Sequence, residues 1–372
     1  MNGIPDVFAI YFPQFHRTEL NDRLWGEGFT EWHNVAVGTE LFKGHESPHL
    51  PGELGFYDLS DAKAVNRQIG LAIDHGIRGF ACYHYWFSGK RILSEPVDHL
   101  YAADSSLQLF LIWANESWTR SWSGAAHEVI LEQEFTDEDY RSHFYEILPK
   151  LQSPSNLRID GKPVFGVYRM SNFPDPQAFI DCWQELAKQN GLEGIYFVGI
   201  LRSELDFALV GKVSVDAWSE FAPEARAMSL HGMSLMRKLR VRIPEALLKY
   251  RVLRYKYVTE RARALSFPAK TWPCIFPGWD NTARRRKGGG VVVKGSTPEL
   301  FGEELLHSMT LAAQRELPLV LINAWNEWGE GNYLEPSFRH GRDYLETVQQ
   351  VVSEFKSSDN PVKTLLPTRG QA

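Results

Sequence analysis

Glu327 and Glu330 lie three residues apart in the stretch LVLINAWNEWGEGNYLEP, which covers residues 319–336. The stretch begins as an apolar run typical of a buried β-strand and passes directly into carboxylates set among tryptophans and glycines. A buried carboxylate without a partner costs several kcal/mol, so two of them at the end of a core strand require a reason. Paired carboxylates beside aromatic side chains suit glycosidic bond cleavage, which needs an acid to protonate the leaving oxygen.

The spacing of the two glutamates favours one form of this chemistry. In the usual two-carboxylate mechanisms the groups flank the scissile bond from opposite sides of the sugar, about 5 to 9.5 Å apart. Glu327 and Glu330 leave the same short segment, so we expect them to approach from related directions. This arrangement suits a substrate-assisted route, in which one glutamate deprotonates a sugar hydroxyl and the other protonates the departing oxygen. Calcium or magnesium binding is the alternative for clustered acids. The stretch lacks the alternating acidic residues of a calcium loop, so we expect neither a metal nor a cofactor.

Eight β-rich runs bounded by turn residues define the elements that must position these glutamates. They cover residues 7–12, 79–86, 107–113, 163–169, 195–201, 213–218, 272–276 and 319–325. Helical patterns separate most of them, and alternation of strands with helices predicts a parallel sheet. Nearly continuous apolar strands indicate burial on both faces, and eight strand–helix units predict a single α/β domain, a (β/α)8 TIM barrel. A doubly wound open sheet is the alternative, but no GxGxxG or GxxxxGK[ST] motif follows any strand.

Polar and aromatic residues cluster just after most of these strands. In a barrel the carboxyl ends of the strands share one face and surround one pocket. We therefore predict substrate contacts from Tyr11, His16, Trp32, Tyr83, His84, Tyr85, Trp86, Trp113, Asn115, Glu116, Trp118, Asp216, Trp279, Asp280, Trp325 and Asn326. Trp113, Trp118 and Trp279 are the candidates for stacking on sugar rings. Taken alone, an aromatic residue such as Tyr11 is more often part of a core than a ligand contact.

One long insertion, residues 222–270, separates the sixth and seventh predicted strands and reads as helical and basic. Between residues 237 and 263 ten lysines and arginines outnumber two glutamates. The simpler interpretation is a solvated helical excursion from the barrel. The alternative is a surface that contacts an anionic glycan, a lipid-linked glycan or the membrane. We expect residues 1–357 to form the catalytic barrel, including this insertion, and residues 358–372 to form a polar tail.

Composition limits the other classes of function. The formal net charge of −6 gives no general reason to expect nucleic acid as a partner. Three widely spaced cysteines suggest neither a disulfide framework nor a zinc site. The N-terminal residues MNGIPDVFAIYFPQFH contain no basic segment followed by an apolar one, so no signal peptide is visible. We therefore expect a cytoplasmic protein with an oligosaccharide or polysaccharide substrate.

Several motifs together resemble a known group of proteins. The run WNEWGEGNYLEP resembles the NEWxEG motif of glycoside hydrolase family 99, the endo-α-mannanase and endomannosidase family. The whole chain is more similar to the related WbsX-type domain of bacterial polysaccharide loci, often described as a glycosyltransferase. This similarity extends over roughly residues 7 to 350 and is carried by the motifs AIYFPQFH, LWGEGFTEWHNV, GFACYHYWF, WANESWTRSW and PGWDNTARR.

The resemblance implies a role for each glutamate. Glu327 would act as the base on the 2-hydroxyl and produce a 1,2-anhydro sugar, and Glu330 would act first as acid and then as base, with retention of configuration. The route needs an axial 2-hydroxyl trans to an α-linked leaving group, which implies mannose or rhamnose. These roles predict a raised pKa for Glu330 and an ionised Glu327. A glycosyltransferase for O-antigen or capsule synthesis and a non-catalytic carbohydrate-binding barrel are the alternatives.

Overall fold

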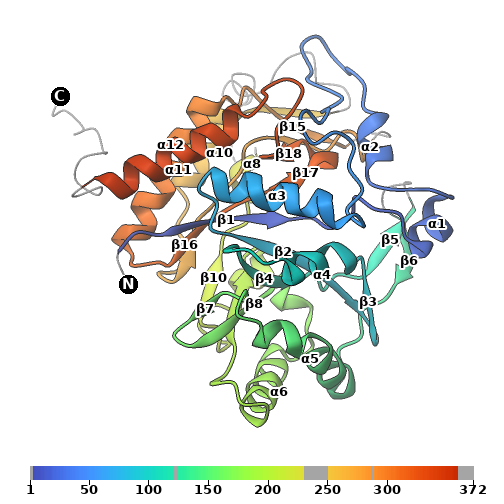
Figure 1. Ribbon diagram of the computed structural model, residues 1–372, viewed down its shortest axis with the longest axis vertical. Coiled ribbons are helices and arrows are strands. Elements are labelled where there is room, and N and C mark those ends of the chain that lie inside the picture. Colours follow the sequence, from blue (N-terminus) through green and yellow to red (C-terminus); the bar gives the residue numbers. More distant parts are fainter. Residues whose placement is uncertain (1–2, 121–124, 230–249, 286–288, 359–372) are drawn as a thin grey trace.

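The computed structural model describes residues 3–120, 125–229, 250–285 and 289–358, and a parallel barrel forms its centre (Figure 1). The order of the strands around the barrel is β12, β10, β9, β8, β4, β2, β1, β16 and β13. Their bounds are β1 Asp6–Tyr11, β2 Gly79–Phe87, β4 Gln108–Trp113, β8 Lys162–Val167, β9 Tyr196–Ile200, β10 Ala217–Ser219, β12 Thr271–Trp272, β13 Cys274–Ile275 and β16 Leu319–Ile322. The prediction of a (β/α)8 barrel is confirmed.

Pro273 divides the seventh strand of the barrel into two short pieces. Proline has no N–H to donate to a sheet, so a ladder is interrupted where it occurs. On one side of Pro273, β12 pairs in parallel with β10, and on the other side β13 pairs in parallel with β16. The same segment therefore joins the sixth strand of the barrel to the eighth and closes the ring.

Helices cover the outside of the barrel, and four of the longer ones begin at side-chain caps. The longer ones are α3 (Ala62–Asp74), α4 (Glu95–Ala102), α5 (Asp137–Gln152), α6 (Pro176–Gln189), α10 (Tyr255–Arg263), α11 (Pro298–Gln314) and α12 (Asp343–Ser357). Asp61, Thr136, Asp175 and Thr297 each accept a hydrogen bond from a backbone N–H in the first turn of the helix that follows. Within the described part of the chain, no helix is both long and apolar enough to span a membrane.

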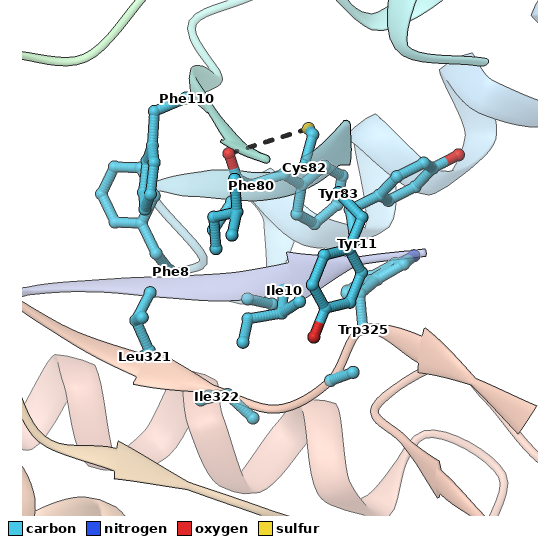
Figure 2. Close-up of a cluster of buried hydrophobic side chains, with 14 of the residues drawn as sticks. Phe8, Ile10, Tyr11, Phe80, Cys82, Tyr83, Phe110, Leu321, Ile322 and Trp325 are labelled. Atoms are coloured by element: carbon cyan, nitrogen blue, oxygen red, sulfur yellow. Dashed lines mark hydrogen bonds between the residues drawn. The ribbon is translucent and has the colours of Figure 1, made fainter. Parts of the chain in front are cut away.

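Aromatic side chains fill the lower part of the barrel. Phe8, Phe110, Tyr196 and Trp272 come from the first, third, fifth and seventh strands. The ring centroids lie 5.9 Å apart for Phe8 and Phe110, 6.1 Å for Phe110 and Trp272, and 6.2 Å for Tyr196 and Trp272. Alternate strands of a TIM barrel contribute such layers because successive residues point to opposite faces. Figure 2 shows Phe8 and Phe110 together beside β1. These side chains pack the barrel at this level, so its open end is the opposite one, where the strands have their carboxyl ends.

Connections at the carboxyl ends of the strands build the rim of that open end. The connection after β1 carries α1 (Glu19–Trp25) and α2 (Trp32–Ala36), and the one after β4 forms the hairpin of β5 (Trp118–Arg120) and β6 (Ala125–Leu131). In Figure 1, α1, β5 and β6 lie together at the right. After β16 the chain forms a second small hairpin, β17 (Asn326–Glu327) and β18 (Asn332–Tyr333), which contains both predicted catalytic glutamates.

The insertion after β10 contains more than helix. Its described parts are α8 (Ala225–Met228), β11 (Arg251–Arg254) and α10. β11 pairs in parallel with β15 (Val291–Lys294), and β15 pairs in antiparallel fashion with β14 (Trp279–Asp280), so the excursions after two barrel strands share a small sheet. Residues 230–249, which include half of the predicted basic surface, and the tail from residue 359 lie outside the described residues.

Candidate active site

A short turn presents Glu327 and Glu330 at the mouth of the barrel. Glu327 ends β17, and Trp328–Glu330 form a 3₁₀ turn before Gly331 adopts a left-handed backbone with φ of 58°. Glycine adopts this conformation without strain. Asn326 fixes the start of the turn, because its side chain accepts from the backbone N–H of Phe12 at 2.8 Å and donates to the Phe12 carbonyl at 3.0 Å.

Arg284 lies among the two glutamates and a third carboxylate, Glu31. Its Nη2 is 2.5 Å from Oε1 of Glu327, and its Nη1 is 3.2 Å from Oε1 of Glu330. Its Nε donates to Oε1 of Glu31 at 2.6 Å. The side chains of Arg284, Glu31 and Glu327 are buried, whereas that of Glu330 is 24% exposed. Both predicted catalytic groups therefore contact one cation, and neither approaches from the opposite wall.

A cavity of about 420 Å³ opens beside these two glutamates. The size lies within the range of about 300 to 1,000 Å³ that is usual for small-molecule sites. Aromatic rings form much of the wall, and several carry a polar atom. The lining residues are Phe12, Gln14, Asn21, Trp25, Phe29, Tyr83, Tyr85, Ala114, Glu116, Ser117, Trp118, Tyr168, Phe221, Arg284, Asn323, Glu327 and Glu330.

The charge balance of the cluster determines the protonation of Glu327. Burial raises the pKa of Glu327 to about 8, the charges of Glu330 and Glu31 act in the same direction, and Arg284 opposes them. Burial also raises the pKa of Glu31. Three carboxylates carry more negative charge than one guanidinium can neutralise, so a proton on Glu327 relieves the excess. The direction of this shift is opposite to the one that a permanently ionised Glu327 would need.

Glycine at position 329 leaves room for the ion pair beneath the turn. A Cβ atom there would lie 2.3 Å from Oε1 of Glu31 and 2.8 Å from Nε of Arg284. The indole of Trp328 supports the turn from another side, because it stacks on Tyr333 with ring centroids 3.7 Å apart. Its Nε1 donates to the buried carboxylate of Glu335 at 2.7 Å. The turn is thus held by specific contacts on both sides.

The strand β2 divides its four predicted site residues between two faces. Tyr83 and Tyr85 line the cavity, whereas His84 and Trp86 point outward to α5, where they contact His143 and Asp139. Successive residues of a strand point to opposite faces, so only every second residue can reach the barrel mouth. The prediction that His84 and Trp86 contact substrate does not agree with their position.

Other predicted site residues brace the barrel. Asn115 accepts from the backbone N–H of Arg169 and donates to its carbonyl, which joins the ends of β4 and β8 as Asn326 joins the end of β1 to β17. Tyr11, Trp113 and Trp325 are fully buried in the layer between barrel and helices. Tyr11 and Trp325 both pack against Phe80 (Figure 2). These side chains lie away from the cavity.

Three further predicted residues also lie outside the cavity. Asp216 precedes β10 and accepts from the backbone N–H of Phe197 at the start of β9, so it is at the opposite end of the barrel. Trp32 donates from Nε1 to the Tyr57 carbonyl and packs behind Trp328. His16 is buried, and burial lowers its pKa. Of the sixteen predicted contact residues, Tyr83, Tyr85, Glu116 and Trp118 are the ones that line the cavity.

Trp279 and Asp280 line a separate, smaller cavity of about 70 Å³. Asp280 accepts from Nε2 of His45 at 2.7 Å, and Nε2 of His49 lies 3.4 Å away. Although burial acts in the opposite direction, these contacts hold the pKa of Asp280 well below its usual range. The backbone N–H of Leu41 lies 3.2 Å from Nδ1 of His45, which fixes the ring so that its Nε2 faces Asp280. Across the described residues, no His, Cys, Asp and Glu side chains form a group of three or more suited to a metal ion.

Glu31 and Arg284 are not among the site residues that the sequence predicts. They belong to the motifs LWGEGFTEWHNV and PGWDNTARR, which carry the family resemblance, but neither follows directly after a strand. Tyr168 is also absent from the predicted contact residues, although it directly follows β8 and lines the cavity. Trp25 and Phe29 come from the long connection after β1, where no sequence rule indicates which side chains return to the mouth.

The sequence profile of the family described as Glycosyltransferase WbsX matches residues 7–348. This chain belongs to the WbsX family. Two curated proteins from strains of Xanthomonas campestris pv. campestris, each called uncharacterized protein WxcX, are 33% identical to it over 354 residues. The matches cover 93% of this chain and 49% of each relative, so the WbsX chain spans about half the length of these proteins.

Solved structures with the same fold include glycoside hydrolases. The GH99 endo-alpha-mannosidase from Bacteroides thetaiotaomicron superposes with a TM-score of 0.60 at 16% identity, over 96% of this chain and 98% of that one. A glycoside hydrolase-like protein superposes with a TM-score of 0.59 at 15% identity, over 94% of each chain. At such identities the likeness establishes a shared barrel fold, and the chemistry must be inferred from the residues of this site.

Proposed function

We propose that this WbsX protein is a retaining glycoside hydrolase or transglycosylase that acts on α-linked, manno-configured sugars of a bacterial polysaccharide. The observation that carries the proposal is the contact of Glu327 and Glu330 with one guanidinium at the edge of an aromatic cavity. Two carboxylates on one wall cannot act as nucleophile and acid from opposite faces of a sugar. Their common wall supports roles at the 2-hydroxyl and the leaving oxygen of the same sugar residue.

The first half-reaction forms a ring within the sugar. Glu327 accepts the proton of the 2-hydroxyl, O2 bonds to C1, and the bond from C1 to the leaving oxygen breaks. Glu330 donates its proton to that leaving oxygen. In the second half-reaction Glu330 takes a proton from water or an acceptor sugar, whose oxygen bonds to C1. The bond from C1 to O2 breaks at the same time, and Glu327 returns its proton to O2. C1 is inverted twice, so the anomeric configuration is retained.

The raised pKa of Glu327 fits a base and sets the pH dependence. A carboxylate whose pKa is near the working pH is a stronger base than an ordinary one. The reaction begins with Glu327 ionised while Glu330 still holds its proton, so loss of the proton from Glu327 should give the rising limb of the pH profile. Trp118, Tyr85 and Phe29 offer ring faces and edges for binding sugar rings in the cavity.

A product assay tests this proposal. The purified protein is incubated with α-linked manno- and rhamno-oligosaccharides, and with polysaccharide of the source organism, each with and without sugar nucleotides. Mass spectrometry then identifies the products, and Glu327→Gln serves as the inactive control. Cleavage or transfer in the absence of a nucleotide is the expected result. Product formation that requires a sugar nucleotide would instead establish a glycosyltransferase.

The glycosyltransferase remains the second candidate because the matching family carries that description. A polysaccharide-synthesising enzyme would meet its acceptor at the membrane, and residues 237–263 are the proposed contact with a membrane or a lipid-linked glycan. Of this segment, Arg251, Arg254, Lys256, Arg261 and Arg263 lie among the described residues. Flotation with vesicles that contain anionic lipid would test the contact independently of any enzyme assay.

A further inference from the structure

The guanidinium of Arg284 distributes its three nitrogen atoms among three carboxylates. Nε contacts Glu31, Nη2 contacts Glu327 and Nη1 contacts Glu330, at 2.6, 2.5 and 3.2 Å. An arginine keeps its charge at all relevant pH values, and its planar fork fixes the directions of its donors. The side chain is 8% exposed and packs against the ring of Phe12, so it has little freedom to turn.

No other cation among the described residues forms an ion pair with either catalytic glutamate. The guanidinium of Arg202 lies over the rings of Phe221 and Tyr168, and Glu116 pairs with Arg169 at 3.5 Å. Burial raises the pKa values of Tyr83, Tyr85 and Tyr168, which face the two glutamates, so these phenols remain neutral. Arg202 interacts with Glu330 through its charge but forms no ion pair with it, so Arg284 is the cation in direct contact with both glutamates among the described residues.

The proposed function makes a specific demand on this cation, and the inference rests on that function. When the 2-hydroxyl proton moves to Glu327 and the proton of Glu330 moves to the leaving oxygen, one negative charge is lost at Glu327 and one appears at Glu330. The second half-reaction moves that charge back. A counter-ion that contacted one glutamate alone would be separated from the negative charge when that charge moves to the other glutamate. The separation would cost free energy of electrostatic reorganisation.

We propose that Arg284 is a positioning residue that serves as the common counter-ion of both glutamates, and that Glu31 holds its guanidinium in the orientation that reaches both. The moving charge then stays in contact with one cation throughout the cycle. Glu31 is 1% exposed and cannot itself reach the substrate, since it does not line the cavity. Gly329 provides the space in which this pair lies beneath the turn.

Two substitutions with opposite electrostatic effects test the proposal. Arg284→Gln removes the charge that opposes a proton on Glu327, and Glu31→Gln removes a charge that favours it. The rise of kcat/KM with pH should therefore move upward by about 1 to 3 pH units for Arg284→Gln. It should move downward, by a smaller amount, for Glu31→Gln. Arg284→Lys keeps the charge without the fork, so it should lower kcat while leaving the pH at half-maximal activity closer to that of the wild type.

Arg342→Gln is the matched control, because it removes the same charge from an exposed pair with Glu53. It should leave the pH dependence of kcat/KM unchanged. If a single variant does not fold, the double variant Glu31→Gln with Arg284→Gln removes both partners and should still show the upward movement. Movement of the two single variants in the same direction, or loss of activity with no movement, would overturn the proposal.

A titration of the glutamate carboxyl carbons by NMR separates this inference from the proposed function. It follows the proton on Glu327 directly and needs no substrate. If the wild type cleaves no manno-configured substrate, the proposed function fails. The same opposed movements of the Glu327 titration would then still support the shared counter-ion. Turnover of such substrates with a Glu327 titration that is the same in all variants would retain the function and reject the role of Arg284.

Discussion

Replacing Gly329 by alanine is expected to destabilise the protein, because the new methyl group would enter the space of a buried ion pair. The Cβ atom would lie 2.3 Å from Oε1 of Glu31 and 2.8 Å from Nε of Arg284. Neither group has solvent to move into, since both side chains are buried. The methyl group must push the two buried groups apart, and overpacking of this kind costs about 1–3 kcal/mol.

Urea unfolding measures this loss as a lower transition midpoint at unchanged slope. Gly70→Ala is the matched control, because a Cβ atom there meets nothing within 4 Å and the position lies inside α3. Alanine in a helix interior should stabilise the control by about 0.5–1 kcal/mol. A Gly329→Ala protein within about 1 kcal/mol of the wild type, less than ordinary overpacking costs, would refute the reasoning.

Further predictions concern the reaction, the cavity and a buried acid outside it. Glu330→Gln should lower kcat on substrates with poor leaving groups by about 10²- to 10⁴-fold. Its kcat on an aryl glycoside should change little, because that leaving group needs no proton. A 2-O-methyl substrate should be inert with the wild type, and its normal turnover would contradict the role of Glu327. Trp118→Ala should weaken oligosaccharide binding about tenfold in calorimetry, whereas Trp279→Ala, in the smaller cavity, should not. Burial raises the pKa of Glu220 from 4.5 to about 8, so the folded state loses stability as the pH rises through that range. In thermal unfolding, the stability of Glu220→Gln relative to the wild type should therefore be higher at about pH 9 than at about pH 4. A stability difference that does not depend on pH would contradict this prediction.

The barrel can be predicted from the sequence because most of its strands are apolar runs long enough to be recognised singly. The sixth strand shows the limit of that signal. Residues 213–218 predict a strand, yet β10 covers Ala217–Ser219. Val213 and Val215 pack on the core from a loop, so their composition imitates a strand. The displacement places Asp216 before the strand instead of after it, and hence at the wrong end of the barrel.

The direction of each side chain is harder to predict than the position of its strand. All nine residues of β2 are buried, because the barrel interior covers one face and the helices cover the other. Polarity therefore does not reveal which of Tyr83, His84, Tyr85 and Trp86 face the mouth. The Glu31–Arg284 contact is equally hidden, because it joins loops 253 residues apart and depends on the closed ring to bring them together.

The difference between a catalytic and a structural carboxylate lies in its partners, which sequence alone does not list. Glu335 stands five residues after Glu330 in the same stretch and is just as suggestive as an acid beside aromatic residues. In the structure its oxygens accept from Trp328 Nε1, Tyr57 Oη and Gln68 Nε2, at 2.6 to 2.7 Å. The carboxylate of Glu335 thus accepts hydrogen bonds from neutral donors and supports the turn. Glu327 and Glu330 instead contact the guanidinium of Arg284 through Oε1 and line the cavity, which is the arrangement that the proposed function requires.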